Sequence, residues 1–140
     1  MAKIDFYIVK DNATDAWLRY ACRLVEKAYD MGLRVHIHTA DESMTKKMDE
    51  LLWIFKEGSF IPHQPVANEN ELCAVTLNHS ELPKHREVLV NLTSSIPDQY
   101  AEFERVAEIV GGDQTLIKAG RERFRMYKEK GEEPKHHEIN

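Results

Sequence analysis

Two histidines and a pair of adjacent carboxylates have side chains that could bind a metal or act in catalysis. His36 and His38 alternate in a short apolar run, so both lie on one face of a predicted strand. A zinc site needs three or four converging ligands, and this pair supplies two, so we interpret both histidines as structural. Asp49 and Glu50 are adjacent on a predicted helix and face different directions. That arrangement is typical of solvated residues, not of two carboxylates that share one substrate.

Glycine is missing from the turn where a bound dinucleotide would require it. Residues 10–14, after the first predicted strand, include no glycine, although a dinucleotide site needs glycines there for close approach of the backbone. Gly111 and Gly112 precede the last predicted helix and could bind an anion, but a turn is the simpler interpretation. The chain also lacks the motifs of P-loop proteins, zinc proteases and serine hydrolases. We therefore expect neither an active site nor a cofactor.

Basic residues gather on the last predicted helix. Residues 115–130 carry a net charge of +4, and the rest of the chain carries −9. Because a helix turns by about 100° per residue, four cations form a strip beside Phe124. These strip residues are Lys118, Arg121, Arg125 and Lys128. The acidic residues Glu122 and Glu129 are expected beyond the strip, so the cations suit an acidic peptide with a hydrophobic end, or phosphates.

A second candidate surface surrounds Trp53. The core-facing stripe of the helix predicted for residues 42–55 consists of Met44, Met48, Leu51 and Phe55. Trp53 lies on the opposite side of that helix, where we expect it to face the basic strip of the last helix. The helix stops near Gly58, and Phe60 and Ile61 follow in a loop. These two residues either tuck under the sheet or form an exposed protein interface.

Strands and helices alternate along the chain. Predicted strands cover residues 3–9, 33–38, 72–77, 88–92 and 105–110. Predicted helices cover residues 15–31, 42–55 and 113–130, with a short helix at 97–103. The alternation predicts a single Rossmann-like α/β domain over residues 1–130, with a mostly parallel sheet and helices on both faces. The tail, residues 131–140, is polar, and we expect it to be disordered.

The overall composition favours a cytoplasmic protein. The net charge is −5, which argues against a general nucleic-acid binder. The N-terminus lacks the apolar stretch of a signal peptide, and no apolar run reaches membrane-spanning length, so we expect no membrane partner. Cys22 and Cys73 are expected to be buried thiols and not a disulfide.

Two motifs are specific in combination. The first is Asp49-Glu50-Leu51-Leu52-Trp53 followed by Gly-Ser-Phe-Ile-Pro-His at residues 58–63. The second is Ala-Gly-Arg-Glu-Arg-Phe-Arg-Met-Tyr-Lys at residues 119–128. With the opening strand, they resemble the chi subunit of bacterial DNA polymerase III holoenzyme, over the chain up to about residue 130. The resemblance implies a non-catalytic Rossmann-like protein without a bound nucleotide, which bridges two partners in DNA replication.

The resemblance also implies two binding faces. One would bind the acidic, phenylalanine-ended C-terminal tail of single-stranded DNA-binding protein, through Trp53, Val110, Arg121, Phe124, Arg125 and Lys128. The other would bind the psi subunit of the clamp loader complex, through Phe60, Ile61 and Pro62. Trp53 and Phe124 would receive the terminal ring of the tail, and Arg121 or Lys128 its terminal carboxylate. DNA is then only an indirect partner.

Two alternatives remain open from the residues alone. A phosphate- or nucleotide-binding α/β enzyme would use Gly111, Gly112 and the start of the last helix, and nucleotides would stabilise it against heat. A direct single-stranded DNA-binding module would use the basic strip, with Phe124 and Tyr127 stacking on bases. That module would bind DNA in the absence of any tail peptide.

Overall fold

The computed structural model describes residues 2–55, 62–65, 74–80 and 82–139. Its strands are β1 (Lys3–Val9), β2 (Val35–His38), β3 (His63–Pro65), β4 (Val75–Asn78), β5 (Val88–Asn91), β6 (Arg105–Val110) and β7 (Lys135–Ile139). Its α-helices are α1 (Ala16–Asp30), α2 (Glu42–Ile54) and α3 (Gln114–Glu129), and a 3-10 turn covers Tyr100–Glu102. The predicted α/β class is confirmed.

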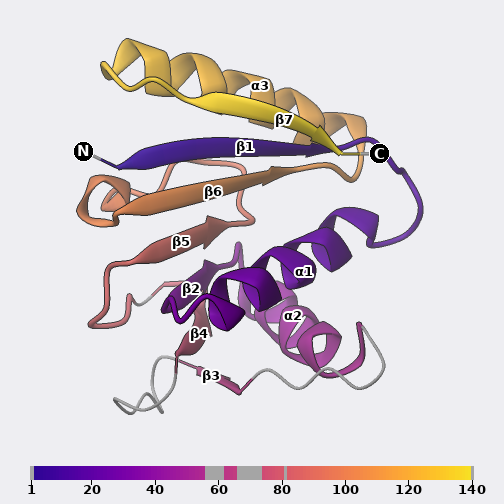
Figure 1. Cartoon of the computed structure of the whole chain (residues 1–140). Helices are drawn as coiled ribbons and strands as arrows, with labels where there is room; N and C mark the ends of the chain where they lie inside the picture. Colours follow the sequence, from indigo (N-terminus) through magenta and orange to yellow (C-terminus); the bar gives the residue numbers. More distant parts are fainter. Residues whose placement is uncertain (1, 56–61, 66–73, 81, 140) are drawn as a thin grey trace.

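The described strands form one sheet in the order β3-β4-β2-β5-β6-β1-β7, and each pairing between them is parallel. From β1 the chain moves toward the β3 edge through α1 and α2, then returns through β5 and β6 to α3 and β7. Because parallel crossovers are right-handed, the two directions place α1 and α2 on one face of the sheet and α3 on the other. Figure 1 shows α3 beside β1 and β7 at one end of the sheet, with α1 and α2 toward the other end. The predicted parallel sheet with helices on both faces is therefore confirmed.

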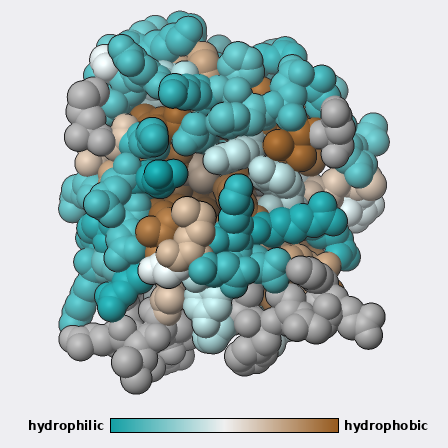
Figure 2. Space-filling model, viewed as in Figure 1, coloured by the Kyte–Doolittle hydropathy of each residue, from teal (hydrophilic) through white to brown (hydrophobic). Residues whose placement is uncertain are grey.

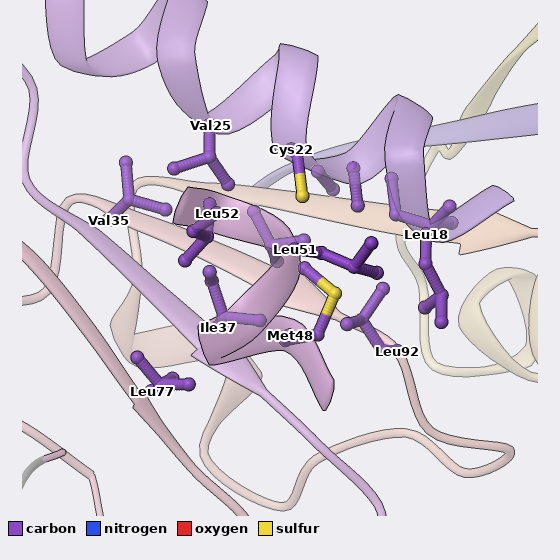
Figure 3. Packing of buried hydrophobic residues seen from close by; sticks show 14 of the residues in the cluster. Leu18, Cys22, Val25, Val35, Ile37, Met48, Leu51, Leu52, Leu77 and Leu92 are labelled. Atoms are coloured by element: carbon purple, nitrogen blue, oxygen red, sulfur yellow. The ribbon is translucent and has the colours of Figure 1, made fainter. Parts of the chain in front are cut away.

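The face under α1 and α2 is filled by aliphatic side chains. Val25 of α1, Ile37 of β2 and Leu52 of α2 are completely buried there. Figure 3 shows Cys22 and Val25 of α1 directed toward the α2 side chains. Burial raises the pKa of the Cys22 thiol to about 12, so it is an unreactive packing residue at neutral pH. This confirms the expectation for Cys22, whereas Cys73 lies outside the described residues.

The face under α3 is held by aromatic rings. Phe6 of β1 lies edge-on to Phe124 and Tyr127 of α3, with ring centroids 5.1 and 5.7 Å apart. Tyr127 also meets Tyr100 edge-on at 5.0 Å. Phe6, Tyr127 and Phe103 are almost completely buried. Edge-to-face ring pairs are stabilising beyond the apolar area that they bury, so they help to fix α3 over β1 and β6.

Strand β7 corrects the expectation of a disordered tail. Lys135–Ile139 pair with β1 in parallel, with Phe6 opposite His136 and Ile8 opposite Glu138. The backbone N–H of Lys10 extends the ladder by donating to the carbonyl of Ile139 at 3.0 Å. The strand was missed because its sequence is polar and its side chains are mostly exposed, as an edge strand permits. Strand β3, at the opposite edge of the sheet, was also not predicted.

Polar side chains dominate the face of the molecule shown in Figure 2, and hydrophobic residues are visible only in small groups between them. Trp53 and Ile54, at the end of α2, are 47% and 67% exposed. Two adjacent exposed apolar residues mark a candidate protein interface. Among the described helices, none has the length and apolar character needed to cross a membrane.

Candidate functional site

Helix α3 approaches the sheet through a glycine. Asp113 caps the helix, since its carboxylate accepts a hydrogen bond from the Leu116 N–H at 2.9 Å. At Gly120, an added Cβ atom would lie only 2.7 Å from a methyl carbon of Val110. The missing side chain therefore allows the close contact between α3 and β6. This contact positions Arg121 and Phe124 beside the strand ends.

A pocket of about 680 Å³ lies between α3, β1 and β7. Its apolar lining consists of Phe6, Ile8, Val9, Val110, Ile117 and Phe124. Its polar and charged lining includes Lys10, Asp11, Asn12, Gln114, Arg121, His136 and Glu138. The volume and the mixture of apolar and polar groups are typical of a ligand site. Such a pocket can hold a hydrophobic side chain while the charged groups orient a ligand.

Four of the residues predicted for tail binding lie together at this pocket. Val110, Arg121 and Phe124 line it directly. The Lys128 ammonium lies 5.0 Å from the centre of the Phe124 ring, within the range of a cation–π interaction. The predicted arrangement of α3 cations beside an aromatic ring is thus present.

Arg125 differs from the prediction. Its guanidinium lies 2.6 Å from a carboxylate oxygen of Glu122 and 3.3 Å from one of Glu129. Side chains three and four positions apart on a helix are neighbours, so glutamates beside the strip can still reach it, and the expectation that they leave the strip cations without partners was wrong for Arg125. Arg125 is exposed, but its charge is balanced on the helix itself. Arg121 and Lys128 are therefore stronger candidates for contact with an anionic ligand.

Trp53 does not share this pocket. It lies on α2, whose buried residues pack on the sheet face opposite the α3 core. Its ring meets that of His63, on the edge strand β3, with centroids 4.7 Å apart. Trp53 is exposed as predicted, but the expectation that it faces the basic strip was wrong. The helical pattern gives the direction of Trp53 around α2, and it contains no information on which sheet face α2 covers.

The residues predicted for psi binding are only partly described. Phe60 and Ile61 lie outside the described residues, and Pro62 is half-buried just before β3. Trp53 and Ile54 are exposed at the end of α2, and Trp53 contacts His63, which follows Pro62. The described part of this region is therefore an apolar surface separate from the α3 pocket.

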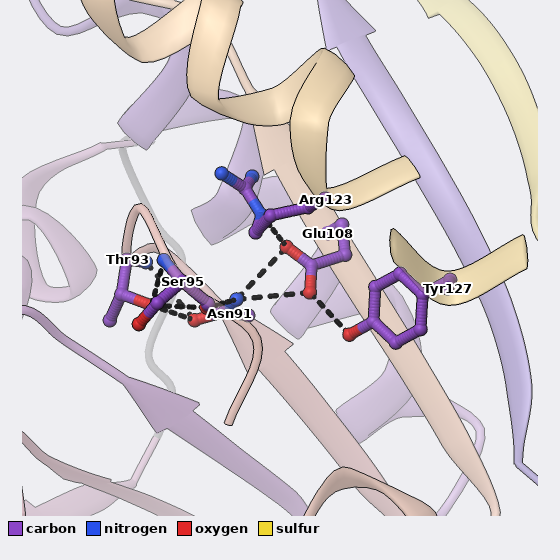
Figure 4. A network of polar contacts seen from close by, with 6 residues as sticks. All are labelled: Asn91, Thr93, Ser95, Glu108, Arg123 and Tyr127. Carbon is purple, nitrogen blue, oxygen red and sulfur yellow. Dashed lines mark hydrogen bonds and ion pairs between the residues drawn. The ribbon is translucent and has the colours of Figure 1, made fainter. Parts of the chain in front are cut away.

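A buried polar network under α3 was not predicted. Glu108 of β6 is completely buried, and it accepts hydrogen bonds from Arg123 at 2.8 Å and from the Tyr127 hydroxyl at 2.6 Å. The Asn91 amide donates to both oxygens of Glu108, at 2.9 and 3.0 Å (Figure 4). Burial raises the pKa of the Glu108 carboxyl, and these donors oppose that rise. Charged residues at core-facing positions, Glu108 and Arg123, were the available signal in the sequence.

The position of Tyr127 bears on the DNA-binding alternative. Tyr127 is completely buried, and its hydroxyl is engaged by Glu108. Stacking of DNA bases requires an exposed ring face. The stacking role expected for Tyr127 was therefore wrong.

The histidine and glycine candidates have structural explanations. His36 is completely buried, with Nδ1 2.9 Å from the hydroxyl of Thr76. No group of three or more metal-ligating side chains suited to a metal ion occurs in the described part of the chain. At Gly111 an added Cβ atom would lie 2.5 Å from the Cβ of Trp17, and Gly112 has φ of +84°. Close packing and a left-handed backbone thus account for the glycine pair.

The fold and the pocket define a Rossmann-like α/β domain with a candidate binding site along its last helix. A family model described as "DNA polymerase III chi subunit, HolC" matches residues 1–135. The chain therefore belongs to the DNA polymerase III chi subunit family, whose members are accessory subunits in DNA replication. The resemblance identified from the two motifs is confirmed.

Individual relatives agree with the family match. The chain is 40% identical over 132 residues to the DNA polymerase III subunit chi of Pseudomonas aeruginosa, covering 94% of this chain and 92% of the relative. It is 30% identical over 136 residues to the chi subunit of Haemophilus influenzae, covering 94% of each. It is 26% identical over 139 residues to the chi subunit of Escherichia coli, again covering 94% of each.

Proposed function

We propose that this chain is a non-catalytic connector of the DNA polymerase III holoenzyme in the cytoplasm. One surface binds the acidic C-terminal tail of single-stranded DNA-binding protein, and another binds the psi subunit of the clamp loader. The family membership supports a replication role. The α3 pocket supports the tail contact, because it combines an apolar lining with cations.

The observation that carries the tail assignment is the position of Arg121 and Lys128 around Phe124. Phe124 lines the pocket with Arg121, and the Lys128 ammonium lies 5.0 Å from the Phe124 ring centre. The terminal phenylalanine of the tail would enter the pocket beside Phe124 and Val110. Its carboxylate would pair with Arg121 or Lys128, and aspartates of the tail would contact the remaining cations.

A labelled peptide ending in Asp-Asp-Ile-Pro-Phe tests this assignment by fluorescence anisotropy. Because exposed ion pairs are weak and screened by salt, we expect a Kd on the order of micromolar that rises with salt. Arg121→Ala and Lys128→Ala should each weaken binding several-fold, whereas Arg23→Ala, an exposed arginine on α1, is the matched control. Unchanged affinity in both α3 variants would contradict the assignment.

The psi assignment rests on the apolar surface at the end of α2. Trp53 and Ile54 are exposed there, and the sequence continues into Phe60, Ile61 and Pro62. We propose that these residues form one interface, which moves Trp53 from the tail site to the psi site. Co-purification with psi should be lost for Trp53→Ala and Phe60→Ala and retained for Arg121→Ala. If Arg121→Ala lost psi while Trp53→Ala and Phe60→Ala retained it, the assignment of psi to the surface at the end of α2 would be contradicted.

A further inference from the structure

Strand β7 contributes one wall of the α3 pocket. The matched family region ends at residue 135, so it includes only the first residue of β7. Two later residues, His136 and Glu138, line the pocket. Their register partners on β1 are Phe6 and Ile8, which also line it. Alternate residues of a strand share one face, so His136 and Glu138 both face the α3 side of the sheet.

This wall carries an ion pair at the end of the pocket. The Lys10 ammonium lies 3.0 Å from a carboxylate oxygen of Glu138, and both side chains are about half exposed. The hydrogen bond and charge of Lys10 lower the pKa of the Glu138 carboxyl, so Glu138 is an anion at neutral pH. Lys10, a cation of the pocket lining, is therefore already paired with a carboxylate of its own chain.

We propose that Glu138 is a specificity-determining residue of the pocket, because its carboxylate competes with a ligand carboxylate for Lys10. This inference rests on the proposed function, in which an acidic peptide occupies the pocket. The apolar lining accepts the hydrophobic end of such a peptide whether or not the Lys10–Glu138 pair is intact. While the pair is intact, Glu138 repels the next carboxylate of the peptide. Once Glu138 has moved away from Lys10, the lysine attracts that carboxylate. A site that includes a repulsive group discriminates among ligands by their charge as well as by their shape.

The first test removes the charge of Glu138 in the full chain. Glu138→Gln should bind the Asp-Asp-Ile-Pro-Phe peptide about two- to five-fold more tightly, since a rim charge changes affinity modestly. Glu133→Gln is the matched control: it changes the net charge equally, and Glu133 is exposed and outside the pocket lining. Thermal melting of both variants checks that each is folded, and Glu138→Ala replaces the glutamine variant if that variant melts early. Equal gains in the Glu133 and Glu138 variants, or no gain in the latter, would overturn the proposal.

The second test measures coupling between the two side chains. Lys10→Ala should weaken peptide binding more in the Glu138→Gln background than in the otherwise unchanged chain, because Glu138 no longer occupies the lysine there. Equal losses in the two backgrounds would overturn the proposal.

Two different results distinguish an error in the proposed function from an error in the role of Glu138. If the peptide does not bind, or if Arg121→Ala and Lys128→Ala both leave its affinity unchanged, the proposed function is wrong, and the role of Glu138 falls with it. If the α3 variants weaken binding and Glu138→Gln has no effect, only the role of Glu138 is wrong.

Discussion

Gly120 is the residue on which the geometry of the pocket depends most directly. An added Cβ atom would lie 2.7 and 2.8 Å from the two methyl carbons of Val110, so α3 would have to move away from β6. We expect Gly120→Ala to lower the free energy of unfolding by about 1–3 kcal/mol, the usual cost of overpacking. Urea denaturation measures it, with the exposed Thr115→Ala on the same helix as the control. An unchanged midpoint for Gly120→Ala would show that α3 adjusts without cost.

His36 is a residue whose burial makes stability depend on pH. Burial, followed by the nearby His38, His85 and Arg86, lowers the pKa of His36 to about 3. The unfolded chain protonates His36 near its ordinary pKa of about 6.5. Neutral His36 therefore contributes fully to the stability of the folded state above about pH 6.5. This contribution is lost as the pH falls from about 6.5 toward 3.

The expected loss is about 1 kcal/mol of unfolding free energy for each pH unit in that window. Urea denaturation at neutral pH and at about pH 5 should show a smaller loss for His36→Gln than for the unchanged chain. His136→Gln, at an exposed histidine of β7, is the control and should keep the full loss. The same loss in the His36 variant would mean that other groups cause the pH dependence.

At the residue scale, helix periodicity was enough to place side chains around their own helix, and it could not identify their neighbours on other elements. The exposure of Arg121, Lys128 and Trp53 follows from that periodicity. The pairing of Arg123 with Glu108 does not, because the two residues belong to different elements. Periodicity places Arg123 on the inward side of α3, and the buried Glu108 of β6 supplies the carboxylate that pairs with it there.

At the scale of the element, α3 is anchored by that buried charge pair. Arg123→Met would leave the Glu108 carboxylate buried without its cation, and we expect a loss of about 3–5 kcal/mol of unfolding free energy. Arg125→Met is a close control, since Arg125 also pairs with glutamates but is exposed to solvent, and it should cost much less than Arg123→Met. Urea denaturation of both variants compares the two pairs. Similar losses would contradict the structural role assigned to Glu108.

Strands with apolar sequences were predictable, and the polar edge strand β7 was not. The strands β1, β2, β5 and β6 carry runs of β-branched and aromatic residues, and all were predicted within a few residues of their bounds. Strand β7 contains Lys-His-His-Glu-Ile, whose pattern indicates no buried face. It is held by backbone pairing to β1, by the stacking of His137 on Tyr7 and by the contact of His137 with Asp5. Such stabilisation depends on a neighbouring strand that a local pattern does not include.

At the scale of the whole molecule, the sheet separates the two proposed binding surfaces. The α3 pocket lies on one face, and Trp53 lies on a helix that covers the other. We expect Trp53→Ala to leave the Kd for the tail peptide within two-fold, because distant sites without shared contacts act nearly independently. Anisotropy titration of this variant beside Arg121→Ala checks the separation. A large loss in the Trp53 variant would restore the sequence-based assignment of Trp53 to the tail site.

The α3 pocket is lined by residues from both the first and the last strand of the described chain, so it forms late in folding. Phe6, Ile8 and Val9 of β1 and residues 10–12 after it form one side of the pocket, and β7 forms another. During synthesis the N-terminal side emerges first, and contacts between distant segments form slowly. The pocket can therefore be completed only after residues 135–139 have left the ribosome. A nascent chain that already carries α1, α2 and most of the sheet would still lack the complete pocket, so the proposed tail binding would begin only after this region has been synthesised.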